Sequence, residues 1–600
     1  MIYHSETDGP HTPAASKSAG SAVWHCRLST VMALLLFSNV LPAHSEGNIK
    51  VKVYSFIYSP YVEYRQVEAI NAGLNASFAA RQWTVAPNVT VQVVPPPPNN
   101  VEVVDALQRV ATTEKGLFVV FGPLTDIETL HALPLLKRED LVAFAPSTGS
   151  SIVRGWNPNI YFIRASPTAE LIALVRYAVS QLRLLRIGFM YLQDISFGDS
   201  EYKHAVELFS HMGRELCGVF TVKSSMEAFA DDRAFEAAWE AFAKTRPQGV
   251  IAVAPPINDT MRFLNKIVAD KRTRDAYVLA HSTLEFSIVG AWREALEAAG
   301  APLKFGQVIL TGTNPLAKNT LYRAIRRFQD HMRSYLSANP GVTVFNGTDN
   351  FDHDDVDGRL MVYGWIAGEV LSQALSSREW LTSRKAFMES LYNQRRYVID
   401  DLVIGDFGGD CKGGAAKQGA ACNCNQGGSL VLMNVIGSGY RLFPVNGGVT
   451  IFDSKKCYIN KPRIPSPMSI LSLTLFDTAL PVDTYASMSE ALYASTRGRE
   501  SALSRRLFFH SMASSSAESA RTLQHQLDTR SVTAVFGVVD DAMLSIAEVA
   551  FVDPVMLTPR LHHRGKNVIQ LSPTLEQQLF VVVGYVTNTS ARTPMSAIVT

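Results

Sequence analysis

Apolar runs and amphipathic segments alternate regularly along this chain. From Asn48, VKVYSFIYS reads as a first strand, and residues 64–80 read as a helix with Val67, Ile70, Leu74 and Phe78 on one face. A strand over 89–94, a helix over 101–112 and a strand over 117–121 follow. Strands that alternate with helices predict a parallel sheet covered by helices.

A second set of units begins after Ser166. Strands are predicted at 186–192, 219–222, 249–254, 276–280 and 307–311, with helices at 200–212, 232–244, 259–270, 318–336, 357–376 and 378–393. The fold class is therefore α/β and bilobed, with lobe 1 at about 46–165, lobe 2 at about 166–305, and later segments completing both lobes. Ligands of such open sheets bind outside the carboxyl ends of the strands, so we expect the site in the cleft between the lobes.

Part of lobe 1 is written twice. GLFVVFGPLTD, LVAFAPSTGSS and NIYFIRASPTAEL stand in order within 116–171, and AVFGVVDD, VMLTP and NVIQLSPTLEQQ repeat that order within 534–578. The offset between matching residues, such as Asn159 and Asn567, stays at about 410. Independent helix-start chemistry explains the shared S-P-T-x-E motif, but not the common order. We predict a first bilobed domain at 46–458, with a Cys- and Gly-rich end at 405–458, a linker at 459–467, and the first lobe of a truncated second copy at 468–600.

Composition places the chain among ordinary globular proteins, with 47% apolar residues and a net charge of +2. Six hundred residues exceed one hydrophobic core, in agreement with several domains. No basic stripe or tail points to a nucleic-acid partner. Beyond the N-terminal region we find no run long enough to cross a bilayer, so the chain is expected to be soluble after processing.

Residues 1–45 have the pattern of a secretory signal. A polar stretch with Lys17 and Arg27 precedes an apolar run over 31–43, and Ala43-His44-Ser45 supplies small residues at the cleavage positions. The polar part is long, which a start codon set too far upstream would explain. A signal anchor is the alternative, but a bilayer span needs roughly 20 apolar residues.

Sequons and cysteines agree with a secretory compartment. Candidate glycosylation sites are Asn75, Asn88, Asn258, Asn346 and Asn588. Four cysteines gather late in the first domain, at Cys411, Cys422, Cys424 and Cys457, without the paired spacing of a zinc ribbon. Two disulfides are predicted, with three connectivities open. Cys217 is left over, or pairs with one of the four and frees another.

The loop at 145–151, APSTGSS, follows a strand at the predicted cleft. Its hydroxyls and free backbone N–H groups suit a carboxylate or phosphate, and a capped helix start requires the same residue types. The preferred interpretation of Gly122 is a tight turn, and the second is a backbone position that faces a ligand. The second copy reads LTPRLHHRG in place of this loop, so it need not bind the same molecule.

Other motifs carry no chemistry. In the segment at 352–358, DHDDVDG, alignment of Gly358 to the sixth position of a calcium loop puts His353 first and Gly364 twelfth, so no metal site is predicted. No G-x-S-x-G, H-E-x-x-H or Walker motif appears, and no catalytic residues are assigned. A secreted hydrolase would need a nucleophile constellation that we do not find.

The quoted lobe strings, together with RIGFMYLQDISFGDSEY, resemble type I periplasmic binding proteins, whose two lobes form a Venus flytrap. The segment over 392–434, with IDDLVIGDFGG and CNCNQGG, is similar to the extracellular part of kinetoplastid receptor-type adenylate cyclases. That resemblance implies a tandem flytrap ectodomain followed by a membrane helix and a cyclase domain that converts ATP to cAMP. Neither of those later parts has a counterpart here. No cofactor is expected in this chain, since Mg or Mn would serve only the absent cyclase domain.

The resemblance also implies partners, ligand contacts and location. The expected partners are a small polar ligand and, in a full receptor, a second copy, with the membrane reached only through the missing helix. Candidate ligand-binding residues are Gly122, Ser147, Thr148, Ser150, Ser151 and, from the facing lobe, Tyr191. The secretory pathway would deliver a full receptor to the cell surface or flagellar membrane, and a truncated product would be secreted.

The leading hypothesis is a ligand-sensing ectodomain that works by lobe closure. The alternative is a stand-alone secreted solute-binding or decoy protein. Sequence beyond Thr600 distinguishes them, because a membrane span and a cyclase domain would follow only in the first case.

Overall fold

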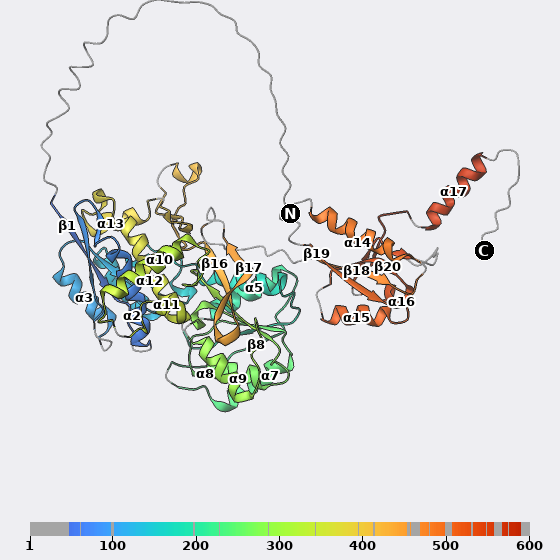
Figure 1. Cartoon of the computed structure of the whole chain (residues 1–600), viewed down its shortest axis with the longest axis horizontal. Coiled ribbons are helices and arrows are strands. Elements are labelled where there is room, and N and C mark those ends of the chain that lie inside the picture. Colours follow the sequence, from blue (N-terminus) through green and yellow to red (C-terminus); the bar gives the residue numbers. More distant parts are fainter. Residues whose placement is uncertain are drawn as a thin grey trace, which may run out of the picture. The chain divides into compact units, whose positions relative to one another are not determined.

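Two α/β domains follow each other in the computed structural model (Figure 1). The described residues are 47–59, 62–97, 101–195, 198–226, 228–285, 287–342, 344–393, 395–411, 414–452, 457, 468–478, 480–497, 507–529, 532–547, 549–556, 567–573 and 575–589. The predicted signal region and the whole of the predicted linker lie outside them.

Lobe 1 of the first domain is built on a six-stranded sheet. Its order is β2-β3-β1-β4-β5-β6, comprising Thr84–Ala86, Val89–Val94, Ile49–Ser55, Phe118–Phe121, Ala143–Phe144 and Ile160–Tyr161. β1, β4, β5 and β6 are parallel, with Ser55 opposite Phe121, whereas β2 and β3 form an antiparallel hairpin. Parallel strands buried on both faces explain the continuous apolar run FVVF of β4.

Helices from two distant parts of the chain cover this sheet. The early ones are α2 (Tyr64–Ala79), α3 (Val103–Thr113) and α4 (Asp126–Arg138). The later ones are α10 (Arg323–Ala338), α11 (Asn350–His353), α12 (Asp355–Ala374) and α13 (Arg384–Leu391). Apolar residues of α3 and α4 form one core cluster with Phe118 and Val120 of β4.

Helices α2 and α12 cross at very short range because glycines meet there. A Cβ atom added to Gly364 would lie 1.9 Å from the carbonyl oxygen of Ile70, and one added to Gly73 would lie 2.0 Å from that of Met361. Only glycine fits such a backbone approach. Glu369 of α12 adds ion pairs at 2.5 Å with Arg81, just past α2, and at 2.7 Å with Arg327 of α10.

Lobe 2 holds a seven-stranded sheet in the order β17-β16-β11-β10-β9-β7-β8. The strands are Leu442–Ile451, Leu430–Ile436, Val308–Gly312, Tyr277–Ala280, Gly249–Ala252, Ile187–Met190 and Gly218–Phe220. The strands from β8 to β11 run parallel, and β16 and β17 are added antiparallel. The late segments therefore complete this sheet as well as the helices of lobe 1.

Helices cover both faces of the lobe 2 sheet (Figure 1). α7 (Asp232–Lys244), α8 (Asn258–Ala269) and α9 (Ile288–Ala299) pack on the face that carries Val250 and Ala252. α5 (Pro167–Ser180) and α6 (Asp199–His211) pack on the face of Ile251 and Val253. The four consecutive residues 250–253, in β9 and directly after it, alternate between the two cores, as expected where helices cover both faces of a sheet.

Two disulfides hold the Cys- and Gly-rich end of this domain. Cys411 bonds to Cys422 and Cys424 bonds to Cys457, with Cα–Cα distances of 5.3 and 5.5 Å. Cys217 keeps a free thiol. Cys424 belongs to β15 (Cys424–Asn425), which pairs with β14 (Phe407–Gly408) next to a hairpin of β12 (Tyr397–Ile399) and β13 (Leu402–Ile404).

The second domain repeats the strand order of lobe 1. Its sheet runs β19-β18-β20-β21-β23, comprising Leu507–Ser514, Met468–Leu475, Ala534–Val539, Ala550–Val552 and Val568–Ile569, all parallel, and β22 (Val555–Met556) pairs with β20. This is the order β3-β1-β4-β5-β6. The helices are α14 (Val482–Arg497), α15 (Ser519–Thr529), α16 (Asp541–Leu544) and α17 (Leu575–Thr589).

Matching residues make matching contacts in the two copies. The side-chain amide of Asn159 donates to the carbonyl oxygens of Leu136 and Leu141, and that of Asn567 donates to those of Ile546 and Val549. Gly122 and Gly537 both have positive φ, at 102° and 119°. The predicted duplication is confirmed.

The predicted sequons differ in exposure. Asn88, Asn258 and Asn346 are exposed. The amide of Asn75 instead donates to the hydroxyl of Tyr335 at 3.3 Å, between α2 and α10. Asn588 falls in α17. Within the described part of the chain, no helix combines the length and the apolar character that a bilayer span requires.

Candidate functional site

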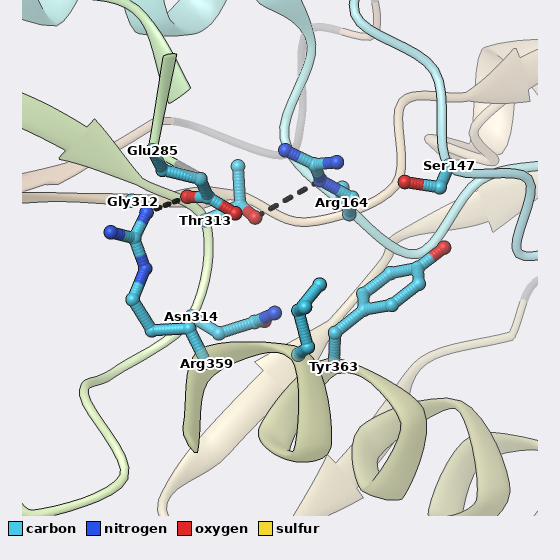
Figure 2. A pocket seen from close by; sticks show the side chains of 9 residues that line it. Ser147, Arg164, Glu285, Gly312, Thr313, Asn314, Arg359 and Tyr363 are labelled. Atoms are coloured by element: carbon cyan, nitrogen blue, oxygen red, sulfur yellow. Dashed lines mark hydrogen bonds and ion pairs between the residues drawn. The ribbon is translucent and has the colours of Figure 1, made fainter. Parts of the chain in front are cut away.

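A pocket is lined by segments of both lobes (Figure 2). Lobe 1 contributes Ser147, which follows β5, and Arg359, Leu360 and Tyr363 of α12. Lobe 2 contributes Glu285, after β10, and 312–314, at the end of β11. Arg164 lies on the segment that crosses from β6 to α5. The strands of both lobes thus present their carboxyl ends here, as expected for an open α/β sheet.

Arg164 is oriented by hydroxyl groups of lobe 2. Its Nε donates to Oγ1 of Thr313 at 3.2 Å and its Nη2 to Oγ of Ser282 at 3.0 Å. The Ser282 hydroxyl in turn donates to Glu170 at 3.0 Å. Burial raises the pKa of Glu170, but His281, Arg164 and the hydroxyls of Ser282 and Thr311 outweigh it, so the pKa lies below its ordinary value. Glu170 is therefore ionised behind Arg164.

Arg154 holds the backbone of the same crossing. Its guanidinium donates to the carbonyl oxygens of Arg164 and Ala165 at 3.3 and 3.2 Å, and lies 3.8 Å from the ring centroid of Phe162. Burial, together with the charge of Arg164, lowers the pKa of Arg154 to about 9. It stays protonated at pH 7, and it fixes Arg164 in place.

An ion pair between Arg359 and Glu285 joins α12 of lobe 1 to lobe 2 (Figure 2). Both side chains are largely buried, and Nη1 of Arg359 has no hydrogen-bond partner among the described residues. Burial, with a further contribution from Arg164, lowers the pKa of Arg359 to about 9, so this group also stays charged at pH 7.

Tyr363 completes the lobe 1 wall, one turn after Arg359. Its hydroxyl donates to the carbonyl oxygen of Ala145 at 2.6 Å and points toward the side of the cavity where Ser147 lies (Figure 2). Burial raises the pKa of Tyr363, which is therefore neutral at physiological pH.

The predicted serine loop has mixed contacts. Ser147 lines the cavity, and Thr148 is buried with no described partner for its hydroxyl. Ser150 accepts the N–H of Ile152, which is the capping role. The loop N–H groups are already bound, because those of Gly149 and Ser150 donate to Asp126, at 3.3 and 3.0 Å, and that of Ser151 donates to Glu201 of lobe 2 at 3.1 Å.

Gly122 and Tyr191 do not line the cavity. Gly122 forms the turn after β4, with its N–H bound to the carbonyl of Phe144. Tyr191 is 7% exposed and stacks on Tyr202 with ring centroids 5.0 Å apart. Their ligand-binding role, like that of the loop residues, stays a prediction.

The acidic run before α12 binds basic residues of the protein. Asp354 caps the helix, Asp357 pairs with Arg65 at 2.5 Å, and Asp355 pairs with Arg441 at 2.9 Å. Arg441 lies beside β17, so the Asp355 pair is another contact between the lobes.

Sequence reasoning missed the charged residues of the cavity, Arg164, Glu285 and Arg359. Arg164 had a usable signal, because it directly follows a buried strand at the predicted cleft edge. Arg359 stands alone as a cation in the apolar run of α12. Glu285 had no comparable signal.

The unusual CNCNQGG string packs on the segment that leads from β6 of lobe 1 to α5 of lobe 2. Asn425 accepts the N–H of Phe162 at 3.1 Å and its amide donates to the carbonyl of Ile160. A Cβ on Gly427 would lie 2.1 Å from the carbonyl oxygen of Arg164. The motif thus lets two crossing segments run side by side at the base of the cavity.

Family models match both domains with the same description, an adenylate cyclase, periplasmic binding protein-like domain, at residues 169–312 and 464–600. The chain is 44% identical to receptor-type adenylate cyclase ESAG 4 of Trypanosoma brucei brucei, over 93% of this chain and 46% of that protein. It is a relative of the receptor-type adenylate cyclases. Receptor-type adenylate cyclase A of Leishmania donovani is 26% identical, over 88% of this chain and 40% of the relative. The chain spans about half the length, or less, of these cyclases.

Solved structures agree on the fold. An extracellular ligand-binding receptor from Verminephrobacter eiseniae aligns with a TM-score of 0.50 and 17% identity, covering 66% of this chain and all of that one. A substrate-binding protein of an ABC transporter from Aeropyrum pernix gives 0.50 and 12%, covering 68% of this chain and 97% of that one. The predicted bilobed, type I periplasmic-binding-protein-like fold is confirmed.

Proposed function

We propose that this chain is the extracellular ligand-sensing region of a receptor-type adenylate cyclase, and that a small polar ligand binds between the lobes of its first domain. The observation that carries the proposal is the cavity whose wall comes from both lobes. Ser147 and Tyr363 belong to lobe 1, and Glu285 and Thr313 belong to lobe 2. The relationship to receptor-type cyclases along most of the chain supports the same function.

Lobe closure is the proposed mechanism. A ligand that touches both walls binds the closed arrangement more tightly than an open one, and this difference in affinity shifts the equilibrium toward closure. In a full receptor at the cell surface or flagellar membrane, closure would alter the geometry of a homodimer and so the rate at which a cyclase domain, with Mg or Mn, converts ATP to cAMP.

Closure can be tested on the purified chain with small polar metabolites of anionic, zwitterionic, neutral and cationic classes. At a concentration 100 times its Kd, a ligand stabilises the folded state by about 2.7 kcal/mol, which a thermal unfolding scan detects. We expect at least one class to raise the unfolding midpoint and to reduce the radius of gyration in X-ray scattering. If no class changes either quantity, ligand-driven closure is refuted.

A further inference from the structure

The charged side chains that line the cavity carry a net positive charge, and the ionised Glu170 that offsets part of it lies behind Arg164 and does not itself line the cavity. Among the described residues, no carboxylate lies within ion-pair distance of Arg164, and its Nη1 has no hydrogen-bond partner. Among the described residues, the guanidinium of Arg164 donates to the neutral hydroxyls of Thr313 and Ser282 and lies 5.8 Å from the ring centroid of Tyr363. A guanidinium that faces a cavity with a free donor is suited to a carboxylate or a phosphate, which it can bind through two N–H groups.

A second guanidinium reinforces this charge. Arg359 lines the same cavity and forms an ion pair with Glu285. The three charged residues of the described wall, Arg164, Arg359 and Glu285, therefore sum to one positive charge. The buried Nη1 of Arg359 lacks a partner in the described structure. Burial of like charges is unfavourable unless an anion compensates them.

The serine loop is not the place for that anion. The N–H groups of Gly149, Ser150 and Ser151 are bound to the protein carboxylates Asp126 and Glu201, which would repel a second anion. The uncharged remainder of the cavity wall offers the hydroxyls of Ser147 and Thr313 and the amide of Asn314.

We propose that the ligand is a small oxyanion, carrying a carboxylate or a phosphate that Arg164 binds, with Arg359 of α12 adding its charge. This inference rests on the proposed function, since it names the chemical class that the sensing cavity accepts. Arg164 anchors the anion, and Glu285 restrains Arg359.

The test uses the full chain and titration calorimetry with defined probes. Succinate, L-malate and L-glutamate represent carboxylates, inorganic phosphate and glycerol 3-phosphate represent phosphates, and succinamide and putrescine are the neutral and cationic counterparts. We expect an anionic probe to bind and Arg164→Gln to weaken that binding about 10-fold or more, because a charged hydrogen bond is lost. Whether the carboxylate probes or the phosphate probes bind more tightly identifies which of the two groups the cavity recognises.

Two further variants keep the result interpretable. Glu285→Gln removes the negative charge from the cavity wall, so anion binding should become tighter, and a weaker binding would contradict the proposal. Arg262→Gln, which removes ion pairs between α8 and α7 away from the cavity lining, is the matched control and should leave binding unchanged. Circular dichroism shows whether each variant is folded. If Arg164→Gln does not fold, Arg164→Lys replaces it, because lysine retains the charge but not the planar guanidinium.

The outcomes separate the two proposals. Binding of succinamide or putrescine with closure, but of no anion, overturns the oxyanion assignment and leaves the sensing function intact. Anion binding that is indifferent to Arg164→Gln also overturns it. If no probe of any class binds, both the oxyanion assignment and the sensing function fail.

Discussion

Replacement of Gly364 by alanine tests whether the crossing of α2 and α12 sets the stability of lobe 1. The new Cβ would lie 1.9 Å from the carbonyl oxygen of Ile70 and 3.0 Å from the amide nitrogen of Leu74. These are backbone atoms and cannot rotate away, so α12 must move outward by more than an ångström. Overpacking of this kind costs up to about 3 kcal/mol. Alanine regains about 1 kcal/mol of helix propensity, so a net loss of about 2 kcal/mol is expected.

Gly290→Ala is the matched control, because Gly290 also lies in a helix, α9, and nothing is within 4 Å of its added Cβ. That variant should be stabilised by up to about 1 kcal/mol. Urea unfolding of the full chain, followed by fluorescence and circular dichroism, measures both. Since Tyr363 precedes Gly364, the displaced helix should also weaken ligand binding. If Gly364→Ala is as stable as Gly290→Ala, the close crossing is not a constraint and the reasoning is refuted.

Three other predictions concern the first domain. Removal of the disulfide between Cys424 and Cys457, which closes a separation of 33 residues, should cost about 3–4 kcal/mol in urea unfolding, and an unchanged midpoint would contradict this. Burial raises the pKa of Glu369, but its arginine partners lower it below 4.5, so its stabilising contribution is present above pH 4.5 and is lost as the pH falls through the lowered pKa. Glu369→Gln should therefore lower the free energy of unfolding by about 3 kcal/mol at pH 7, and the difference from the parent protein should narrow below pH 4.5. A difference that stays constant with pH would contradict this. After expression in a secretory host, glycopeptide mass spectrometry should find a glycan on the exposed Asn88 and none on Asn75, whose amide is bound inside the lobe; a glycan on Asn75 would count against the packing of α2 on α10.

Much of the architecture could be predicted because its signals are local and repeated. The strand runs, the S-P-T-x-E helix start and the paired Asn159 and Asn567 are short patterns that burial and capping demand wherever they occur. Helix α9 was not predicted, although Ile288, Trp292 and Leu296 have helical spacing in the sequence. The antiparallel addition of β16 and β17 to lobe 2 has no local signal, because it depends on a return of the chain.

The cavity was predicted in place but not in chemistry. Its expected position followed from the rule that strand ends meet at the cleft, and Ser147 lies there. Arg164, Glu285 and Arg359 are separated by many tens of residues in sequence, and only the crossings of the chain bring them together. The N–H groups of the serine loop looked free in the sequence because their partners, Asp126 and Glu201, are supplied by a helix start and by the other lobe.

The bridge between Cys424 and Cys457 has a mechanical consequence. Cys424 adjoins Asn425, which grips the backbone of the first crossing, and Cys457 is the last described residue before the chain leaves for the second domain. A covalent bond therefore links Cys457 to the residues that pack on the connection between the two lobes. The bond thus ties the last described residue of the first domain covalently to the strand that packs on the connection between its two lobes.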